Sequence, residues 1–172
     1  MTGVAAIVLA AGEASRFGSP KQRLLLPSVL ERVRASSVHE IVVVAGAYDL
    51  DPADDDVRIV TCPEWHAGPG ASLRCGVSAL DEDVEAAVVV LADGPELSPA
   101  AVDRVVGEWR RSGGIVAASY DGSRGHPLVL GRADWPDIPD DGLRDRPVRL
   151  VPCDDLGAPG DVDTPDDLGD EE

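Results

Sequence analysis

The chain has 172 residues, 44% of them hydrophobic, and a formal net charge of −17. This length and composition predict one globular domain with a core of ordinary size. The negative charge repels the phosphates of nucleic acids and anionic membrane surfaces, which argues against either as a partner. The apolar run 4–11 is too short for a signal peptide or a membrane span, so we expect a cytoplasmic protein.

Short apolar runs rich in β-branched residues alternate with segments of helical spacing. In chain order we predict a strand at 4–10, a helix at 24–35, strands at 40–45 and 57–61, a helix at 72–80, a strand at 86–92, a helix at 99–111 with Ser98 as its N-cap, and strands at 114–119, 127–130 and 148–151. This alternation predicts a single Rossmann-like α/β domain of three layers, with a mostly parallel sheet, helices on both faces and a small antiparallel excursion. The domain is expected to span 1–168, with a loop at 132–145 and an acidic tail at 169–172.

The three cysteines, Cys62, Cys75 and Cys153, show no CxxC pair and no Cys/His ligand spacing. Their odd number and their spacing therefore imply neither a disulfide framework nor a zinc site. Acidic residues cluster at 49–56 and 154–172, and we interpret both runs as solvated loop and tail.

Ligands of open α/β sheets bind at the carboxyl ends of the strands, which here directs attention to 11–21, 45–48, 62–72 and 92–95. The first of these lies within the run LAAGEASRFGSPK at 9–21, whose small residues let backbone N–H groups approach a base and phosphates closely. Arg16 and Lys21 supply the cations. Lys21 is the only lysine of the chain, and composition alone favours a site that needs a compact ammonium no more than it favours chance. The run is neither a Walker A loop nor a GxGxxG loop.

The order LAAGxxxRFGxxK resembles the signature loop of the nucleotidyltransferases that include molybdenum cofactor cytidylyltransferase and guanylyltransferase. The resemblance implies that Arg16 and Lys21 contact the triphosphate and the leaving pyrophosphate. It also implies a nucleotide-binding segment made of Leu9, Ala10, Ala11, Gly12 and Lys21. The sequence LAAG, rather than LAGG, resembles the cytidylyl branch and favours CTP over GTP.

Two further segments resemble nucleotide and metal sites of the same family. Residues 65–76 resemble W-x-x-G-x-G-x-S-L-R-x-G, which implies that Gly70 and Ser72 contact the nucleotide at the opening of a helix. Residues 91–95 resemble L-A-D-x-P, which implies that Asp93 is catalytic and holds Mg²⁺. Taken alone, the first would be a capped helix start and the second a turn cap.

The remaining segments complete the resemblance, which runs from residue 4 to residue 168. Residues 161–168 resemble D-I-D-T-P-E-D-L and imply Asp161 and Asp163 as further metal ligands, although alone they would be an acidic tail with a helix cap. Residues 125–130 resemble G-H-P-V-L-F, and 141–144 resemble G-D-x-G-x-R. Acceptor-binding roles are thereby implied for Gly125, His126 and Arg144, although His126 alone would be a structural histidine.

The resemblance implies Mg²⁺-dependent transfer of a nucleoside monophosphate, CMP from CTP, to a phosphorylated small-molecule acceptor with release of pyrophosphate. Molybdopterin is the first choice of acceptor, with a molybdoenzyme maturation partner. The chain departs from the family in a short segment after Lys21, in Ala14 and in Gly94. These departures leave open a non-catalytic or regulatory nucleotide-binding homologue, and GTP or a sugar-phosphate-type acceptor stays an alternative. A nicotinamide-dependent oxidoreductase would require the GxGxxG loop that the first strand lacks.

Overall fold

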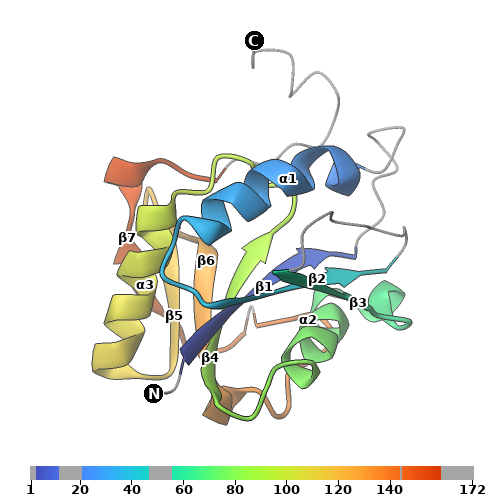
Figure 1. Ribbon diagram of the computed structural model, residues 1–172. Coiled ribbons are helices and arrows are strands. Elements are labelled where there is room, and N and C mark those ends of the chain that lie inside the picture. The colour runs from blue at the N-terminus through green and yellow to red at the C-terminus, as the bar shows by residue number, and fades with distance from the viewer. Residues whose placement is uncertain (1–2, 12–20, 47–55, 144, 160–172) are drawn as a thin grey trace.

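The computed structural model describes residues 3–11, 21–46, 56–143 and 145–159, with only the backbone of residues 21–24. Within these ranges seven strands form one sheet, and three α-helices cover it (Figure 1). The strands are β1 (Gly3–Ala10), β2 (Glu40–Ala45), β3 (Val57–Thr61), β4 (Val84–Leu91), β5 (Ile115–Tyr120), β6 (Ser123–Gly131) and β7 (Arg149–Pro152). The helices are α1 (Lys21–Arg34), α2 (Pro69–Ser78) and α3 (Pro99–Ser112).

The strand order is β3-β2-β1-β4-β6-β5-β7. Neighbouring strands pair in parallel except at β6, which is antiparallel to both β4 and β5. The predicted mostly parallel sheet with a small antiparallel excursion is therefore confirmed. Because β6 is antiparallel to β4, the first residues of β6 lie near the carboxyl end of β4.

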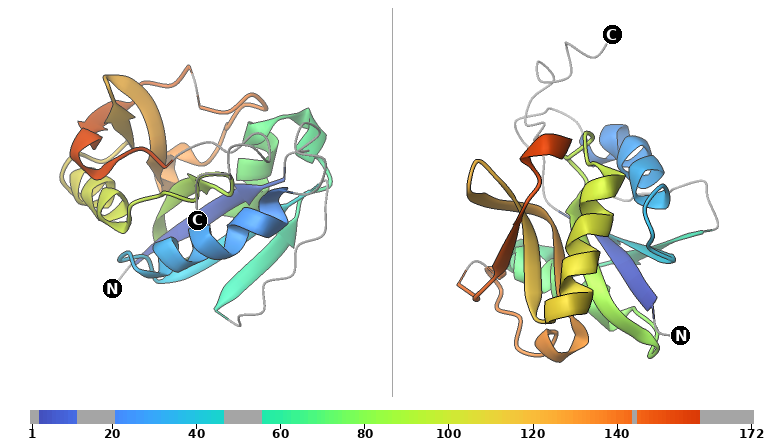
Figure 2. Two further views of the ribbon diagram at one scale, coloured as in Figure 1. Left: turned by 90° about the horizontal axis from the view of Figure 1, so that it is seen from above. Right: turned by 90° about the vertical axis from the view of Figure 1, so that its left-hand side faces the viewer.

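Helices α1 and α3 cover one face of the sheet and α2 covers the other, so the three layers are confirmed (Figure 2). Alternate residues of β1 face opposite sides: Val4, Ala6 and Val8 pack beneath α1 and α3, and their neighbours in the chain pack beneath α2. Burial on both faces explains why the strands are nearly continuous apolar runs. The helix α1 presents the stripe Leu26, Val29, Leu30 and Val33, and each such side chain stabilises the fold by about 1.5–3 kcal/mol when fully buried.

Two helices begin three residues earlier than the sequence patterns predict. Helix α1 begins at Lys21 and includes the exposed Pro27, so the short segment after Lys21 is helical. Helix α2 begins at Pro69, whose fixed φ suits a first helical turn. Ser98 occupies the N-cap position of α3 as predicted, but its side chain makes no capping hydrogen bond. None of the described helices is both long and apolar enough to cross a membrane.

Candidate active site

The candidate site lies where β4 ends and β6 begins. Val89 of β4 pairs with Leu128 of β6, so the two strands diverge beyond this pair toward Asp93 on one side and toward Gly125 and His126 on the other. All three residues are half-buried. The strand pairing therefore brings the segment after β4 and the first residues of β6 to the same edge of the sheet. Two segments that are 33 positions apart in the sequence thus meet at one edge of the sheet.

The imidazole of His126 is held neutral. Burial lowers the pKa of His126 to about 4, with a smaller contribution from the nearby Arg124 guanidinium, while Asp93 acts in the opposite direction. A neutral imidazole at physiological pH can accept or donate a hydrogen bond, but it contributes no positive charge toward a phosphate. Any cation that this edge offers to an anionic ligand must therefore come from another residue.

Two cavities flank the start of β6. A cavity of about 450 Å³, here called the α2-side cavity, is lined by residues that include Leu9, Pro69, Leu73 and Leu143. A second cavity of about 490 Å³, here called the α3-side cavity, is lined by residues that include Leu97, Tyr120 and Pro159. The cavities share Leu91, Arg124, Gly125 and His126 as their common wall. Concave, mostly apolar spaces with a few polar groups are typical of small-molecule sites.

The glycine-rich segment before α2 packs closely against residues 139–142. The N–H of Gly70 donates to the carbonyl of Asp140 at 2.8 Å, and a Cβ at Gly70 would lie 1.6 Å from the carbonyl oxygen of Pro139. Gly68 has a φ of +137°, which side-chain-bearing residues rarely adopt. The close approach of this loop therefore already uses the N–H of Gly70. Ser72 is buried in the first turn of α2.

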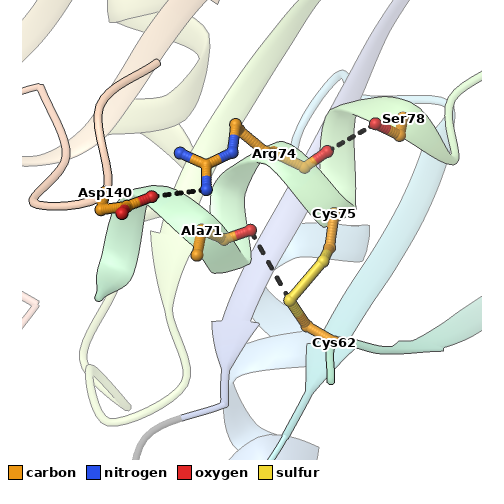
Figure 3. Close-up of a disulfide and its surroundings, with 6 residues drawn as sticks. All are labelled: Cys62, Ala71, Arg74, Cys75, Ser78 and Asp140. Atoms are coloured by element: carbon orange, nitrogen blue, oxygen red, sulfur yellow. Dashed lines mark hydrogen bonds and ion pairs between the residues drawn. A yellow bond between two sulfur atoms is a disulfide. The ribbon is translucent and has the colours of Figure 1, made fainter. Parts of the chain in front are cut away.

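Arg74 fixes that loop from the side of α2. Its Nη1 donates to the carbonyl of Ile138 at 2.7 Å, and its Nη2 contacts Oδ1 of Asp140 at 2.5 Å (Figure 3). Arg74 belongs to the motif at 65–76, but the sequence does not indicate its partners, because they lie more than 60 residues away. Arg74 therefore holds one wall of the α2-side cavity, which Asp141, Gly142 and Leu143 line.

Cys62 and Cys75 form a disulfide, which the spacing of the cysteines does not predict (Figure 3). The expectation that the three cysteines form no disulfide is wrong, because the crossover from β3 into α2 brings the strand end against the second turn of the helix. Cys62 is fully buried and its sulfur lies 3.6 Å from the carbonyl oxygen of Ala71. Cys153 is buried and unpaired.

The structure describes some of the other predicted site residues and not others. Ala10 and Ala11 are buried at the carboxyl end of β1, and Leu9 lines the α2-side cavity. Lys21 opens α1, with its side chain outside what is described. Gly12, Arg16, Arg144, Asp161 and Asp163 lie outside the described residues. In the part of the chain that is described, no three His, Cys, Asp or Glu side chains gather as a metal cluster.

Sequence patterns did not point to Arg124 or Tyr120, although both line the α3-side cavity. The hydroxyl of Tyr120 donates to the carbonyl of His126 at 2.8 Å. Burial, with the negative charges of Cys153 and Asp154, raises the pKa of Tyr120 to about 12, so it stays a donor. The pairing of β5 with β6 brings Tyr120 over the first residues of β6, and no local pattern predicts that contact. Arg124 could have been found from the sequence, because it directly precedes the motif at 125–130.

Comparison with known proteins identifies relatives over nearly the whole chain. Residues 6–151 match the MobA-like NTP transferase domain. The bifunctional protein GlmU of Sorangium cellulosum (strain So ce56) is 28% identical in an alignment that covers 87% of this chain and 33% of that protein. The chain therefore spans about a third of the length of this curated relative.

Solved structures share the fold. The crystal structure of Rv0371c from Mycobacterium tuberculosis H37Rv is similar with a TM-score of 0.79 and 26% identity, covering 98% of this chain and 96% of that one. The structure of Rv0371c in complex with manganese is similar with a TM-score of 0.74 and 25% identity over 98% and 96% of the two chains. A nucleotidyl transferase from Methanothermobacter thermautotrophicus shares the fold at 20% identity, with a TM-score of 0.70 over 96% and 94% of the chains.

Proposed function

Because the chain belongs to the family of MobA-like NTP transferase domains, we propose that it transfers CMP from CTP to a phosphorylated acceptor and releases pyrophosphate. Molybdopterin is the acceptor that we propose first, together with a molybdoenzyme as the maturation partner that receives the product. We also place the reaction in the cytoplasm.

One observation carries the proposal: Asp93 follows β4 at the edge of the sheet where β6 begins, and two cavities flank the Gly125–His126 stretch of β6. Nucleotidyl transfer needs two substrates held end to end, with a metal-binding carboxylate where their phosphates meet. Asp93 follows β4 between two lining residues, Leu91, which lines both cavities, and Gly94, which lines the α3-side cavity. The arrangement supports a two-substrate site better than a single binding pocket.

The residues at this edge suit Mg²⁺. This ion keeps several waters and is held by one or two carboxylates together with substrate phosphates, so a preformed cluster of three side chains is not required. Asp93, with Asp161 or Asp163, would hold it, and the metal would neutralise charge on the phosphate oxygens. The manganese complex of Rv0371c supports a divalent cation in this family.

The chain's own groups then have limited tasks, because the acceptor phosphate attacks the α-phosphorus directly. Arg16 and Lys21 stabilise the negative charge that develops on the departing pyrophosphate. The segment Leu9 to Gly12 and the opening of α2 at Ser72 contact the base and ribose. Neutral His126 donates or accepts one hydrogen bond at the acceptor, and because it carries no charge it does not repel the metal ion.

The test is pyrophosphate release, measured for each of the four common triphosphates against molybdopterin and a panel of sugar phosphates and phosphorylated acids. We expect release with CTP and molybdopterin, and we expect none from the Asp93→Asn variant, which serves as the background control. Release with GTP or with a sugar phosphate would move the chain to another branch of the family. Binding of CTP with Mg²⁺ but no release with any acceptor would identify a regulatory binding protein instead.

A further inference from the structure

The wall between the two cavities contains one cationic side chain. Arg124 lines both the α2-side and the α3-side cavity, and no other described Lys or Arg lines either of them. The chain has 32 acidic and 15 basic residues, so its overall field repels a phosphorylated ligand. A phosphate that enters either cavity therefore needs a local cation, and Arg124 is the described residue that can supply it.

Arg124 is not used up by partners within the protein. Its Nη2 donates to the carbonyl of Leu143 at 2.8 Å, and no described carboxylate forms an ion pair with it. Other arginines behave differently: Arg74 pairs with Asp140, and Arg104 pairs with Asp155. A guanidinium with remaining N–H donors matches a phosphate group in a bidentate manner and binds it more specifically than an ammonium does.

The backbone that carries Arg124 is held in place. Ser119 of β5 pairs with Arg124, and the Tyr120 hydroxyl donates to the carbonyl of His126 two residues later. The ring of Tyr120 lies over Gly125, where an added Cβ would be 3.0 Å from two ring carbons. Arg124 thus extends from a stretch of β6 that β5 holds by strand pairing and by the Tyr120 hydroxyl, which is the preorganisation that a substrate-binding side chain requires.

We propose that Arg124 binds the phosphate of the acceptor, with the acceptor's body in the α3-side cavity and the nucleoside in the α2-side cavity. This division, which rests on the proposed function, follows from the lining residues. The α2-side cavity contains Leu9 and Pro69 from the two segments that resemble nucleotide-binding segments. The α3-side cavity contains no residue of those segments and is lined mainly by apolar side chains such as Leu97 and Tyr120.

The experiment uses phenyl phosphate as the probe, because it joins a phosphate to an apolar ring that fits an apolar cavity. Its affinity is measured by calorimetry with the full chain saturated by Mg²⁺ and α,β-methylene CTP, which cannot release pyrophosphate. The variants are Arg124→Gln, Arg124→Lys and the control Arg146→Gln. Arg146 also donates one guanidinium N–H to a backbone carbonyl, that of Asp137 at 2.7 Å, but it lines neither cavity.

For Arg124→Gln we expect phenyl phosphate to bind about 10- to 100-fold more weakly, the scale of losing charge-assisted hydrogen bonds. Affinity for α,β-methylene CTP should change less than about threefold, because the nucleotide lies on the other side of the wall. Arg124→Lys should recover part of the loss, since it keeps the charge without the planar fork. Arg146→Gln should leave both affinities unchanged. Melting temperatures check that each variant is folded, and Arg124→Lys carries the test if Arg124→Gln is not.

Three outcomes would overturn the assignment. The first is an equal or larger loss of affinity for the CTP analogue, which would place Arg124 on the nucleotide. The second is no loss beyond that of Arg146→Gln, and the third is no binding of phenyl phosphate to the wild-type protein. Failure of the transferase proposal looks different. In that case the wild-type protein binds phenyl phosphate through Arg124 but releases no pyrophosphate with any acceptor. Normal pyrophosphate release by Arg124→Gln would instead refute the role of Arg124 alone.

Discussion

Reduction of the disulfide between Cys62 and Cys75 is expected to destabilise the protein by a predictable amount. The two cysteines are 13 positions apart and close a loop that contains the glycine-rich segment and the first turns of α2. In the chain-entropy description, a loop of this length stabilises the folded state by about 3 kcal/mol, because it restricts the unfolded chain. For a domain of this size, each 1 kcal/mol shifts Tm by about 2–4 °C, so reduction should lower Tm by about 6–12 °C.

The assay is thermal unfolding followed by circular dichroism, with and without dithiothreitol. The double variant Cys62→Ala/Cys75→Ala should melt near the reduced wild-type protein and should not respond to the reductant. Cys153→Ala should keep the full response, because Cys153 is unpaired. Thiol titration of the denatured, unreduced protein should find one thiol, and after reduction it should find three. A Tm difference below about 2 °C, or three thiols before reduction, would refute the reasoning.

Four further predictions concern the site. Asp93→Asn should fold normally but lose metal-dependent pyrophosphate release, since an amide carries no charge to hold the ion; release within a few-fold of wild type would remove Asp93 from the site. Lys21→Ala should lower kcat by about two to four powers of ten with a much smaller effect on CTP affinity, and Lys21→Arg should recover part of the rate; steady-state kinetics with unchanged kcat would contradict this. CTP should raise Tm more than GTP at equal concentration with Mg²⁺, and a larger shift with GTP would end the cytidylyl assignment. The low pKa of His126 means that the unfolded chain takes up a proton below about pH 6.5 while the folded chain does not. Stability should therefore fall by about 1–2 kcal/mol from pH 7 to pH 5, and denaturant unfolding of His126→Gln should show a smaller fall than the wild-type protein.

Much of the fold could be predicted from local patterns in the sequence. The bounds of β2 and β3 agree with the predicted strands at 40–45 and 57–61, because each is a short run rich in β-branched residues. The predicted start of α2 at Ser72 is three residues too late, because Pro69 holds the first helical position. The family resemblance along 4–168 agrees with the match over 6–151, because its motifs are contiguous segments that need no tertiary information.

The composition of the site was decided by the sheet order, which no local pattern contains. Because β6 inserts between β4 and β5 in the reverse direction, Arg124 and His126 reach the end of β4. The same folding brings Asp140 against Gly70 and Arg74, which are 70 and 66 positions away. The sequence by itself determined which segments are strands, helices and candidate binding loops, since these depend on neighbouring residues. Tertiary structure alone decided the Cys62–Cys75 disulfide, the hydrogen bond from Gly70 to Asp140 and the cation between two cavities, because each requires chain segments to meet across the sheet or over a crossover.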